Sequence, residues 1–152
     1  MSEKTDLKEI LGLLARLAVG GVFIYSGAIK ALAPAEEFAY AIETYNVLGA
    51  GPALWAAYAV PWVELYAGLL LAAGIFTRFS GLFTAAMLAF FEVLLAQAWL
   101  RGLPVTSCGC FGASSSNSLP HEFVQNLVLL ALLWLGMRHG RGFSADSAVR
   151  EA

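Results

Sequence analysis

The chain has 152 residues, of which 59% are hydrophobic and only 13% are charged. Soluble domains are typically about 45–50% apolar and about 25% charged, so this composition argues against a soluble domain and predicts an integral membrane protein. The formal net charge of -2 and the absence of a basic patch in the sequence give no indication of nucleic-acid binding.

A short polar lead over residues 1–9 precedes an apolar run over about residues 10–33. A bilayer is spanned by about 20 apolar residues, so this run predicts the first transmembrane helix. A cleaved signal peptide would have a shorter apolar core, and Arg16 interrupts the one seen here. We therefore interpret residues 10–33 as a membrane span.

The remaining chain predicts three further spans and two long loops. Residues 34–52 are expected to form a loop that contains a short amphipathic helix at the membrane interface. The other predicted segments are the spans 53–76, 79–100 and 121–137, the loop 101–120 and a polar tail over 138–152. Four spans with short connections predict an all-α integral membrane fold, in which residues 10–137 form one antiparallel four-helix transmembrane bundle.

The distribution of Lys and Arg predicts the orientation in the membrane. Most of these residues, including Lys8 and Arg78, fall on the side of the two termini, whereas Lys30 and Arg101 fall on the other side. The positive-inside rule therefore predicts cytoplasmic termini and two extracytoplasmic loops in a multi-pass membrane protein.

The only two cysteines, Cys108 and Cys110, lie in the second predicted loop and are separated by Gly109. A disulfide needs Cα atoms about 4.4–6.8 Å apart, and Gly109 can adopt the turn that this distance requires. A ring this small would be strained, and strained disulfides are the labile, oxidising ones. The pattern predicts a redox-active pair in a compartment where disulfides persist, and the alternative is two buried small side chains without chemistry.

The residues after the pair also fit a docking loop. Phe111 could anchor the loop at the membrane surface, and Gly112 allows close approach of a partner backbone. His121, at the start of the fourth span, could stabilise a thiolate or could be an exposed interfacial residue. A Cu(I) site formed by the two cysteines and His121 is a third interpretation, whereas zinc would need a fourth ligand, for which only Glu122 is near.

Four ionisable residues lie inside the apolar runs: Arg16, Lys30, Glu64 and Glu92. Such groups are costly in hydrocarbon and usually face a partner or a cavity. We expect Arg16 to be able to pair with Glu64, and Lys30 to extend toward the outer interface. Glu92, in the outer half of the third span, is a candidate proton acceptor for the thiols, and the alternative is a structural ion pair.

These residues resemble a known superfamily. The first span resembles that of the DoxX-like membrane proteins at Arg16, Gly21, Phe23, Gly27 and Lys30. The second span resembles theirs at Pro61, Glu64, Gly68 and Gly74. The segment Cys108-Gly109-Cys110-Phe111-Gly112 is similar to the signature of the MauE branch, named for methylamine utilisation. The resemblance covers about residues 10–137.

The resemblance implies a four-helix inner-membrane protein linked to thiol or sulfur redox chemistry. MauE-type proteins are associated with disulfide formation in periplasmic partners, and DoxX relatives with thiosulfate oxidation by quinone. We therefore expect a thiol–disulfide redox protein that acts on a periplasmic thioredoxin-like or sulfur-carrying partner, with quinone as a candidate cofactor and no metal. The superfamily also includes non-catalytic assembly helpers, so a membrane scaffold is the main alternative.

The remaining expected partners are lipids and further copies of the chain. Small residues such as Gly20 and Gly27 permit close helix contacts within one chain or between chains, so oligomerisation is a further expectation.

Overall fold

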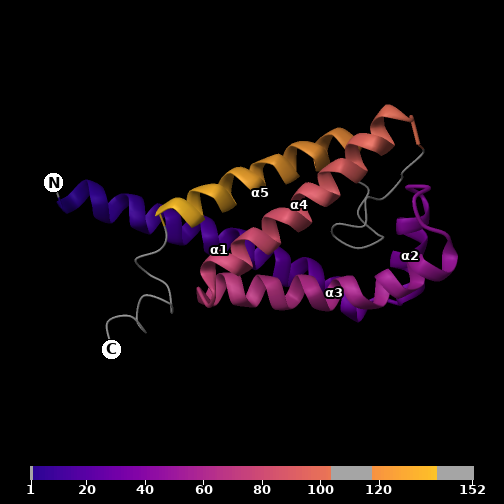
Figure 1. Ribbon diagram of the computed structural model, residues 1–152, viewed down its shortest axis with the longest axis horizontal. Helices are drawn as coiled ribbons and strands as arrows, with labels where there is room; N and C mark the ends of the chain where they lie inside the picture. Colours follow the sequence, from indigo (N-terminus) through magenta and orange to yellow (C-terminus); the bar gives the residue numbers. More distant parts are fainter. Residues whose placement is uncertain (1, 104–117, 140–152) are drawn as a thin grey trace.

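The computed structural model describes residues 2–103 and 118–139, and within these ranges all regular structure is helical (Figure 1). The helices are α1 (Ser2–Leu32), α2 (Ala35–Glu43), α3 (Ala50–Ala73), α4 (Thr77–Leu100) and α5 (Leu119–His139). Four of them, α1, α3, α4 and α5, are long and apolar enough to cross a membrane. The prediction of an all-α membrane fold with four spans is therefore confirmed.

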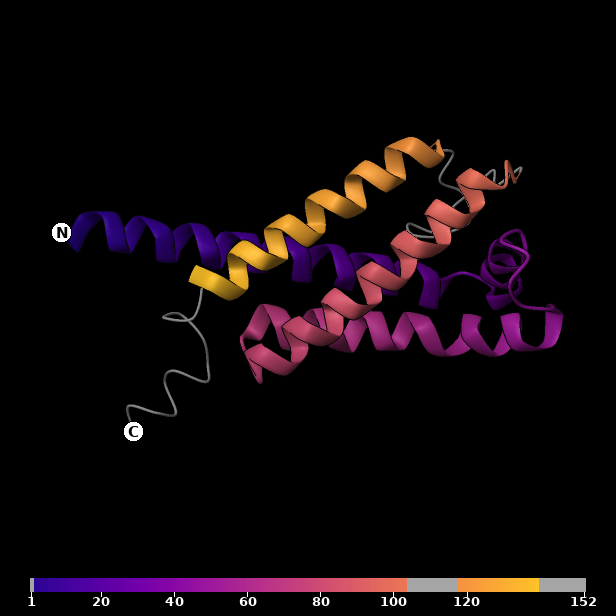
Figure 2. The same ribbon diagram turned by 45° about the horizontal axis from the view of Figure 1, so that its top comes forward.

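The four long helices alternate in direction along the bundle. Helices α1 and α4 run toward the end of the molecule where α2 lies, and α3 and α5 run away from it (Figures 1 and 2). We call this end, where Leu32, Leu100 and Leu119 lie, the loop end, and the opposite end, where α1 begins and α5 ends, the terminal end. The segment that contains both cysteines joins α4 to α5 at the loop end.

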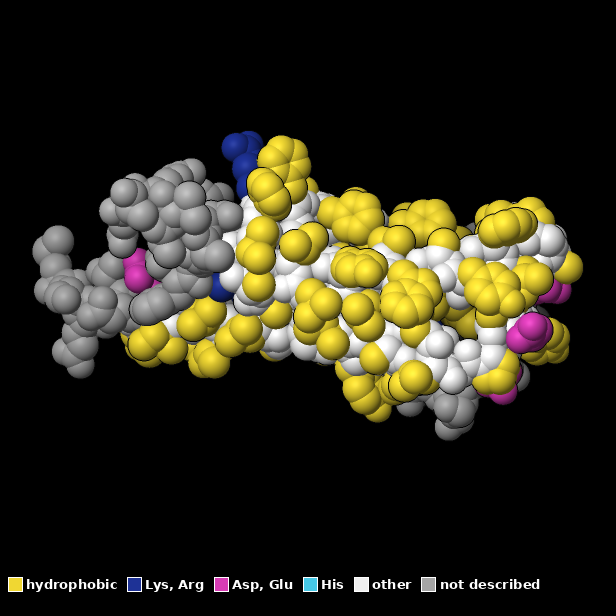
Figure 3. Space-filling model, turned by 90° about the horizontal axis from the view of Figure 1, so that it is seen from below, with side chains coloured by type: hydrophobic (Ala, Val, Ile, Leu, Met, Phe, Trp, Pro, Cys, Tyr) yellow, Lys and Arg dark blue, Asp and Glu magenta, His cyan; other side chains and the backbone are white. Residues whose placement is uncertain are grey.

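Large apolar side chains are spread over the face of the bundle that Figure 3 shows. Trp55 is 78% exposed, Phe79 is 75% exposed and Leu100 is 89% exposed. Exposed apolar surface on this scale is unfavourable in water but is the expected exterior of a protein whose solvent is lipid. The chain is therefore a multi-pass membrane protein whose helices contact lipid.

Helix α1 is longer than the predicted span. It begins at Ser2, ahead of residue 10, and its polar first turns extend beyond the other helices at the terminal end (Figure 1). No glycine or proline lies between Ser2 and Ile10, so nothing in the sequence interrupts the helix before the apolar segment starts.

Helix α2 covers the start of α3 at the loop end. It buries Phe38, Ala39 and Ala41 against Ala53 and Ala57 of α3. Its first turn carries acidic residues on the exposed side, which is the amphipathic pattern of a helix that lies along a surface. Because α2 packs on α3, the Phe38 side chain points into the bundle.

Helices α1 and α3 approach each other closely at their glycines. A Cβ atom added to Gly27 would lie 2.6 Å from the carbonyl oxygen of Pro61, and one added to Gly68 would lie 2.7 Å from that of Gly20. In lipid, association of helices depends on close packing, and small residues at the interface let backbones meet. This contact sets the register of α1 against α3 and so determines which side chains meet across it.

Replacement of Gly27 by Ala should weaken this contact. The added methyl group has backbone atoms on two sides, so we expect Gly27→Ala to lower the free energy of unfolding by about 1–3 kcal/mol. Gly21→Ala is the matched control, because nothing lies within 4 Å of a Cβ atom there. Unfolding in mixed micelles by titration with a denaturing detergent measures both, and equal stabilities would contradict the contact.

Candidate functional site

A buried ion pair joins the last turn of α1 to the middle of α3. The Nζ atom of Lys30 lies 2.7 Å from Oε1 and 2.8 Å from Oε2 of Glu64. The two side chains are 0% and 4% exposed. Removing two charges from water is costly, and the cost is offset only where the geometry is good and the remaining hydrogen bonds are satisfied.

Ser26 supplies the additional hydrogen bonds. Its hydroxyl group lies one helical turn before Lys30, where it donates to Oε2 of Glu64 at 3.1 Å and accepts from Nζ of Lys30 at 3.0 Å. The three side chains thus form a closed triangle of polar contacts between two helices that meet at Gly27. This triangle, Ser26, Lys30 and Glu64, is called the ion-pair cluster below.

Two aromatic rings enclose the Lys30 ammonium group. Its Nζ atom lies 5.0 Å from the ring centroid of Phe38 and 5.8 Å from that of Phe91. A cation within about 6 Å of an aromatic face is stabilised by the ring, more strongly where water is excluded. The expectation that Lys30 extends to the outer interface is therefore wrong, because its side chain turns inward between α2 and α4.

The partner of Glu64 also differs from the expectation. Arg16 is buried at 2% exposure but lies near Gly136 of α5, toward the terminal end. At a rise of about 1.5 Å per residue, it is about 21 Å along α1 from Lys30. The Glu64 carboxylate therefore pairs with Lys30 rather than with Arg16.

A second polar contact joins α4 and α5. The Nδ2 atom of Asn126 donates to Oε2 of Glu92 at 2.7 Å and to the backbone carbonyl oxygen of Leu88 at 2.9 Å. The other carboxylate oxygen of Glu92, Oε1, is buried and has no hydrogen-bond partner in the described part of the chain. Glu92 therefore keeps one acceptor atom available inside the bundle.

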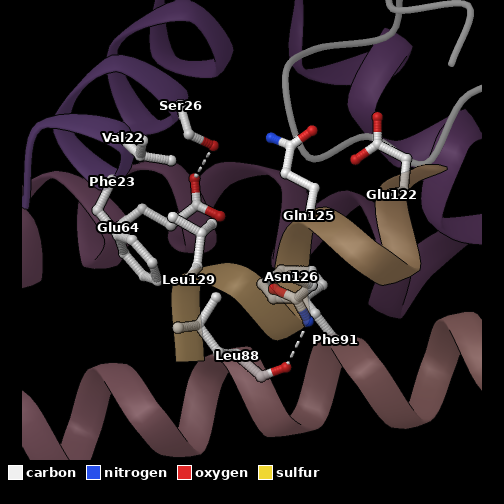
Figure 4. A pocket seen from close by; sticks show the side chains of 10 residues that line it. All are labelled: Val22, Phe23, Ser26, Glu64, Leu88, Phe91, Glu122, Gln125, Asn126 and Leu129. Carbon is white, nitrogen blue, oxygen red and sulfur yellow. Dashed lines mark hydrogen bonds between the residues drawn. The ribbon is translucent and has the colours of Figure 1, made fainter. Parts of the chain in front are cut away.

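A small cavity lies between the ion-pair cluster and this second contact (Figure 4). Its volume is about 40 Å³, which is room for two or three water molecules. The residues around it come from all four spans: Val22, Phe23, Ser26, Glu64, Leu88, Phe91, Glu122, Gln125, Asn126 and Leu129. Ser26 and Glu64 lie on one side and the polar side chains of α5 on the other, but most of the lining surface is apolar. This cavity is called the chamber below.

Glu122 is a buried acid that sequence reasoning did not assign to the site. It lies in the first turn of α5, is 3% exposed and lines the cavity with Gln125 and Asn126. The spacing of these three residues, at i, i+3 and i+4, places them on one face of the helix. A polar face inside an otherwise apolar span was the signal that could have identified them.

Among the residues that the structure describes, none of the other predicted site residues lines the chamber. Cys108, Gly109, Cys110, Phe111 and Gly112 lie outside the described residues. His121 is exposed at the start of α5, next to the buried Glu122. In the described ranges, no group of three or more His, Cys, Asp or Glu side chains could hold a metal ion.

Several large aromatic side chains of α3 and α4 lie on the outer surface. Trp55, Tyr58 and Trp62 of α3 are each more than half exposed, and none lines the cavity. Trp99 of α4 packs edge-on against Phe123 of α5 with their centroids 5.8 Å apart. This arrangement fits side chains that face lipid.

Removal of one charge of the ion pair should cost far more than removal of both. We expect Lys30→Met and Glu64→Leu each to lower the free energy of unfolding by about 3–5 kcal/mol, because each leaves a buried charge alone. The double variant should lose much less than the sum. Unfolding in mixed micelles measures the stabilities of the two single variants and the double variant, which together form a double-mutant cycle.

The control for this cycle pairs Lys30→Met with Glu36→Leu, since Glu36 is exposed on α2. Those two changes should be additive to within about 0.5 kcal/mol. Additive effects for Lys30 and Glu64 would show that the pair contributes no coupling.

Comparison with protein families adds an independent result. Residues 8–138 match the family described as methylamine utilisation protein MauE, and the match extends over all four spans. Searches of curated proteins and of solved structures gave no match. The resemblance to MauE-type proteins is thus confirmed, and the chain belongs to the MauE family.

Proposed function

We propose that this chain is a membrane thiol–disulfide redox protein. The protein lies in the bacterial inner membrane, and its Cys108-Gly109-Cys110 segment exchanges a disulfide with a periplasmic thioredoxin-like or sulfur-carrying partner. The observation that carries the proposal is a pair of carboxyl groups on the two helices that the cysteine segment joins. Glu122 is buried, and Glu92 is partly buried, with its Oε1 atom shielded from solvent.

The positions of these acids support a role in proton handling. Glu122 lies in the first turn after the cysteine segment, and Glu92 lies about 12 Å, or two helical turns, before the end of α4 at Leu100. Exchange requires a thiolate, because the thiolate and not the thiol is the nucleophile. A partner thiol must therefore lose its proton before it attacks, and a nearby carboxylate can accept it.

The proposed exchange has two steps. A partner thiolate attacks the sulfur of one loop cysteine, so that the Cys108–Cys110 disulfide breaks and an intermolecular disulfide forms. The second partner thiolate then attacks the partner's own sulfur in that bond, which breaks and leaves the partner oxidised. Two electrons pass to the loop, and the two protons from the partner thiols end on Cys108 and Cys110, with Glu92 and Glu122 as carriers between them.

A quinone ring does not fit the chamber. The chamber volume is about 40 Å³, whereas a cavity that admits benzene measures about 150 Å³. The chamber is therefore not a quinone site, and the proposed reaction covers the exchange with the partner.

Thiol labelling in intact cells tests the location and resting state of the pair. We expect a membrane-impermeant maleimide to label Cys108 and Cys110 only after mild reduction, because the proposed resting form is an extracytoplasmic disulfide. The double variant Cys108→Ser/Cys110→Ser gives the background. Labelling only after permeabilisation would contradict the predicted extracytoplasmic location of the pair. Labelling without reductant would contradict a resting disulfide.

Trapping separates the redox function from a scaffold. With Cys108→Ser or Cys110→Ser, the remaining loop thiolate can attack the disulfide of an oxidised partner, which is the reverse of the proposed exchange. The loop then has no second cysteine to release the partner, so we expect a mixed disulfide with the partner to accumulate on non-reducing gels. The double variant should show none. A protein that supports growth or partner maturation equally well with both cysteines replaced is a scaffold.

Glu92 and Glu122 should affect the rate of thiol–disulfide exchange and not the fold. A positioned acid or base contributes about 10²–10⁴-fold, so we expect Glu92→Gln and Glu122→Gln to slow reduction of the purified protein by dithiothreitol by about tenfold or more. Glu36→Gln, on the exposed face of α2, is the matched control. Rates equal to that of the control would exclude the proton-handling role.

A further inference from the structure

A second feature lies at the terminal end, away from the cysteine segment. A groove with a volume of about 690 Å³ runs between the first half of α1 and the last turns of α5. Its walls are mostly apolar and include Leu11, Leu14 and Leu135, each of which is at least 40% exposed. A volume of this size lies in the range of sites for small organic ligands, about 300–1,000 Å³.

One end of the groove is basic. Lys8, Arg138 and His139 line it there, and none of the lining residues in the described part of the chain is acidic. The Arg138 guanidinium lies 5.0 Å from the ring centroid of Trp134, a contact that holds the group near the helix surface. Glu9 follows Lys8 in the chain but lies on a different side of the helix and is not a groove residue.

The length of the groove matches one leaflet. Along α1 it extends from Lys8 to Ala18, which at about 1.5 Å per residue is about 15 Å. Half of the hydrocarbon thickness of a bilayer is also about 15 Å. When the apolar walls of the groove lie beside the acyl chain of one leaflet, the basic end of the groove therefore lies at the level of the headgroups. The groove faces the lipid phase.

We propose that this groove is a binding site for an anionic phospholipid. An acyl chain lies between α1 and α5 along Leu11, Leu14 and Leu135, and the phosphate pairs with Lys8 and Arg138. Basic pockets between transmembrane helices select anionic headgroups, and each basic residue near the surface adds to the attraction. The site is independent of the redox function proposed above.

Native mass spectrometry of the purified protein tests the site. We expect phosphatidylglycerol to bind in preference to phosphatidylcholine with the same acyl chains. Lys8→Gln and Arg138→Gln should each weaken phosphatidylglycerol binding about fivefold, because each removes one cation from the headgroup. Arg78→Gln and Arg101→Gln are the matched controls, since both cations are exposed and neither lines the groove.

Two further measurements test the apolar part. Gly12→Leu adds a side chain inside the groove and should weaken binding of both lipids. Glycerol phosphate, which carries the headgroup charge without an acyl chain, should not compete.

Three results would overturn the proposal. The first is an equal loss of binding in the groove variants and the controls, which would mean a general charge effect. The second is competition by glycerol phosphate at the same concentration as the lipid. The third is a dimer that cross-links through a cysteine introduced at Leu14 regardless of added lipid, which would assign the groove to a second copy of the chain.

Discussion

The buried pair of Lys30 and Glu64 is the interaction on which the loop end of this protein depends. It lies where α1 and α3 are closest, because Gly27 lets the two backbones meet one turn before Lys30. Ser26 of α1 hydrogen-bonds to the pair, and Phe38 of α2 and Phe91 of α4 enclose the Lys30 ammonium group. One charged contact thus gathers four of the five helices around a single point.

The two ends of the bundle are built for different surroundings. At the loop end, polar groups point inward beside a mostly apolar chamber of about 40 Å³. At the terminal end, the cations point outward along an open groove. The inward polar groups are kept away from lipid, whereas the outward cations can contact the membrane surface.

Sequence patterns predicted the fold well because long apolar runs have few alternatives in a membrane. They predicted the inward-facing contacts poorly, because depth along a helix says nothing about rotation around it. Lys30 is close enough to the end of α1 to extend outward, and only the placement of α2 over α3 encloses it. Glu122 lies near a predicted loop, where an acid is unremarkable, and only the register of α5 against α1 makes it internal. The cysteine segment lies outside the described residues, so its predicted geometry stays a prediction.

The separation of Lys30 and Glu64 in the chain has a consequence for biogenesis. Synthesis proceeds from the N-terminus, so the span that carries Lys30 leaves the ribosome before the span that carries its counter-ion. Until α3 is synthesised, the unpaired ammonium group of Lys30 makes membrane insertion of α1 less favourable. The carboxylate of Glu64 would do the same for α3 without α1. Insertion of the two spans as a hairpin would pair the Lys30 and Glu64 charges before the later pair of helices is added.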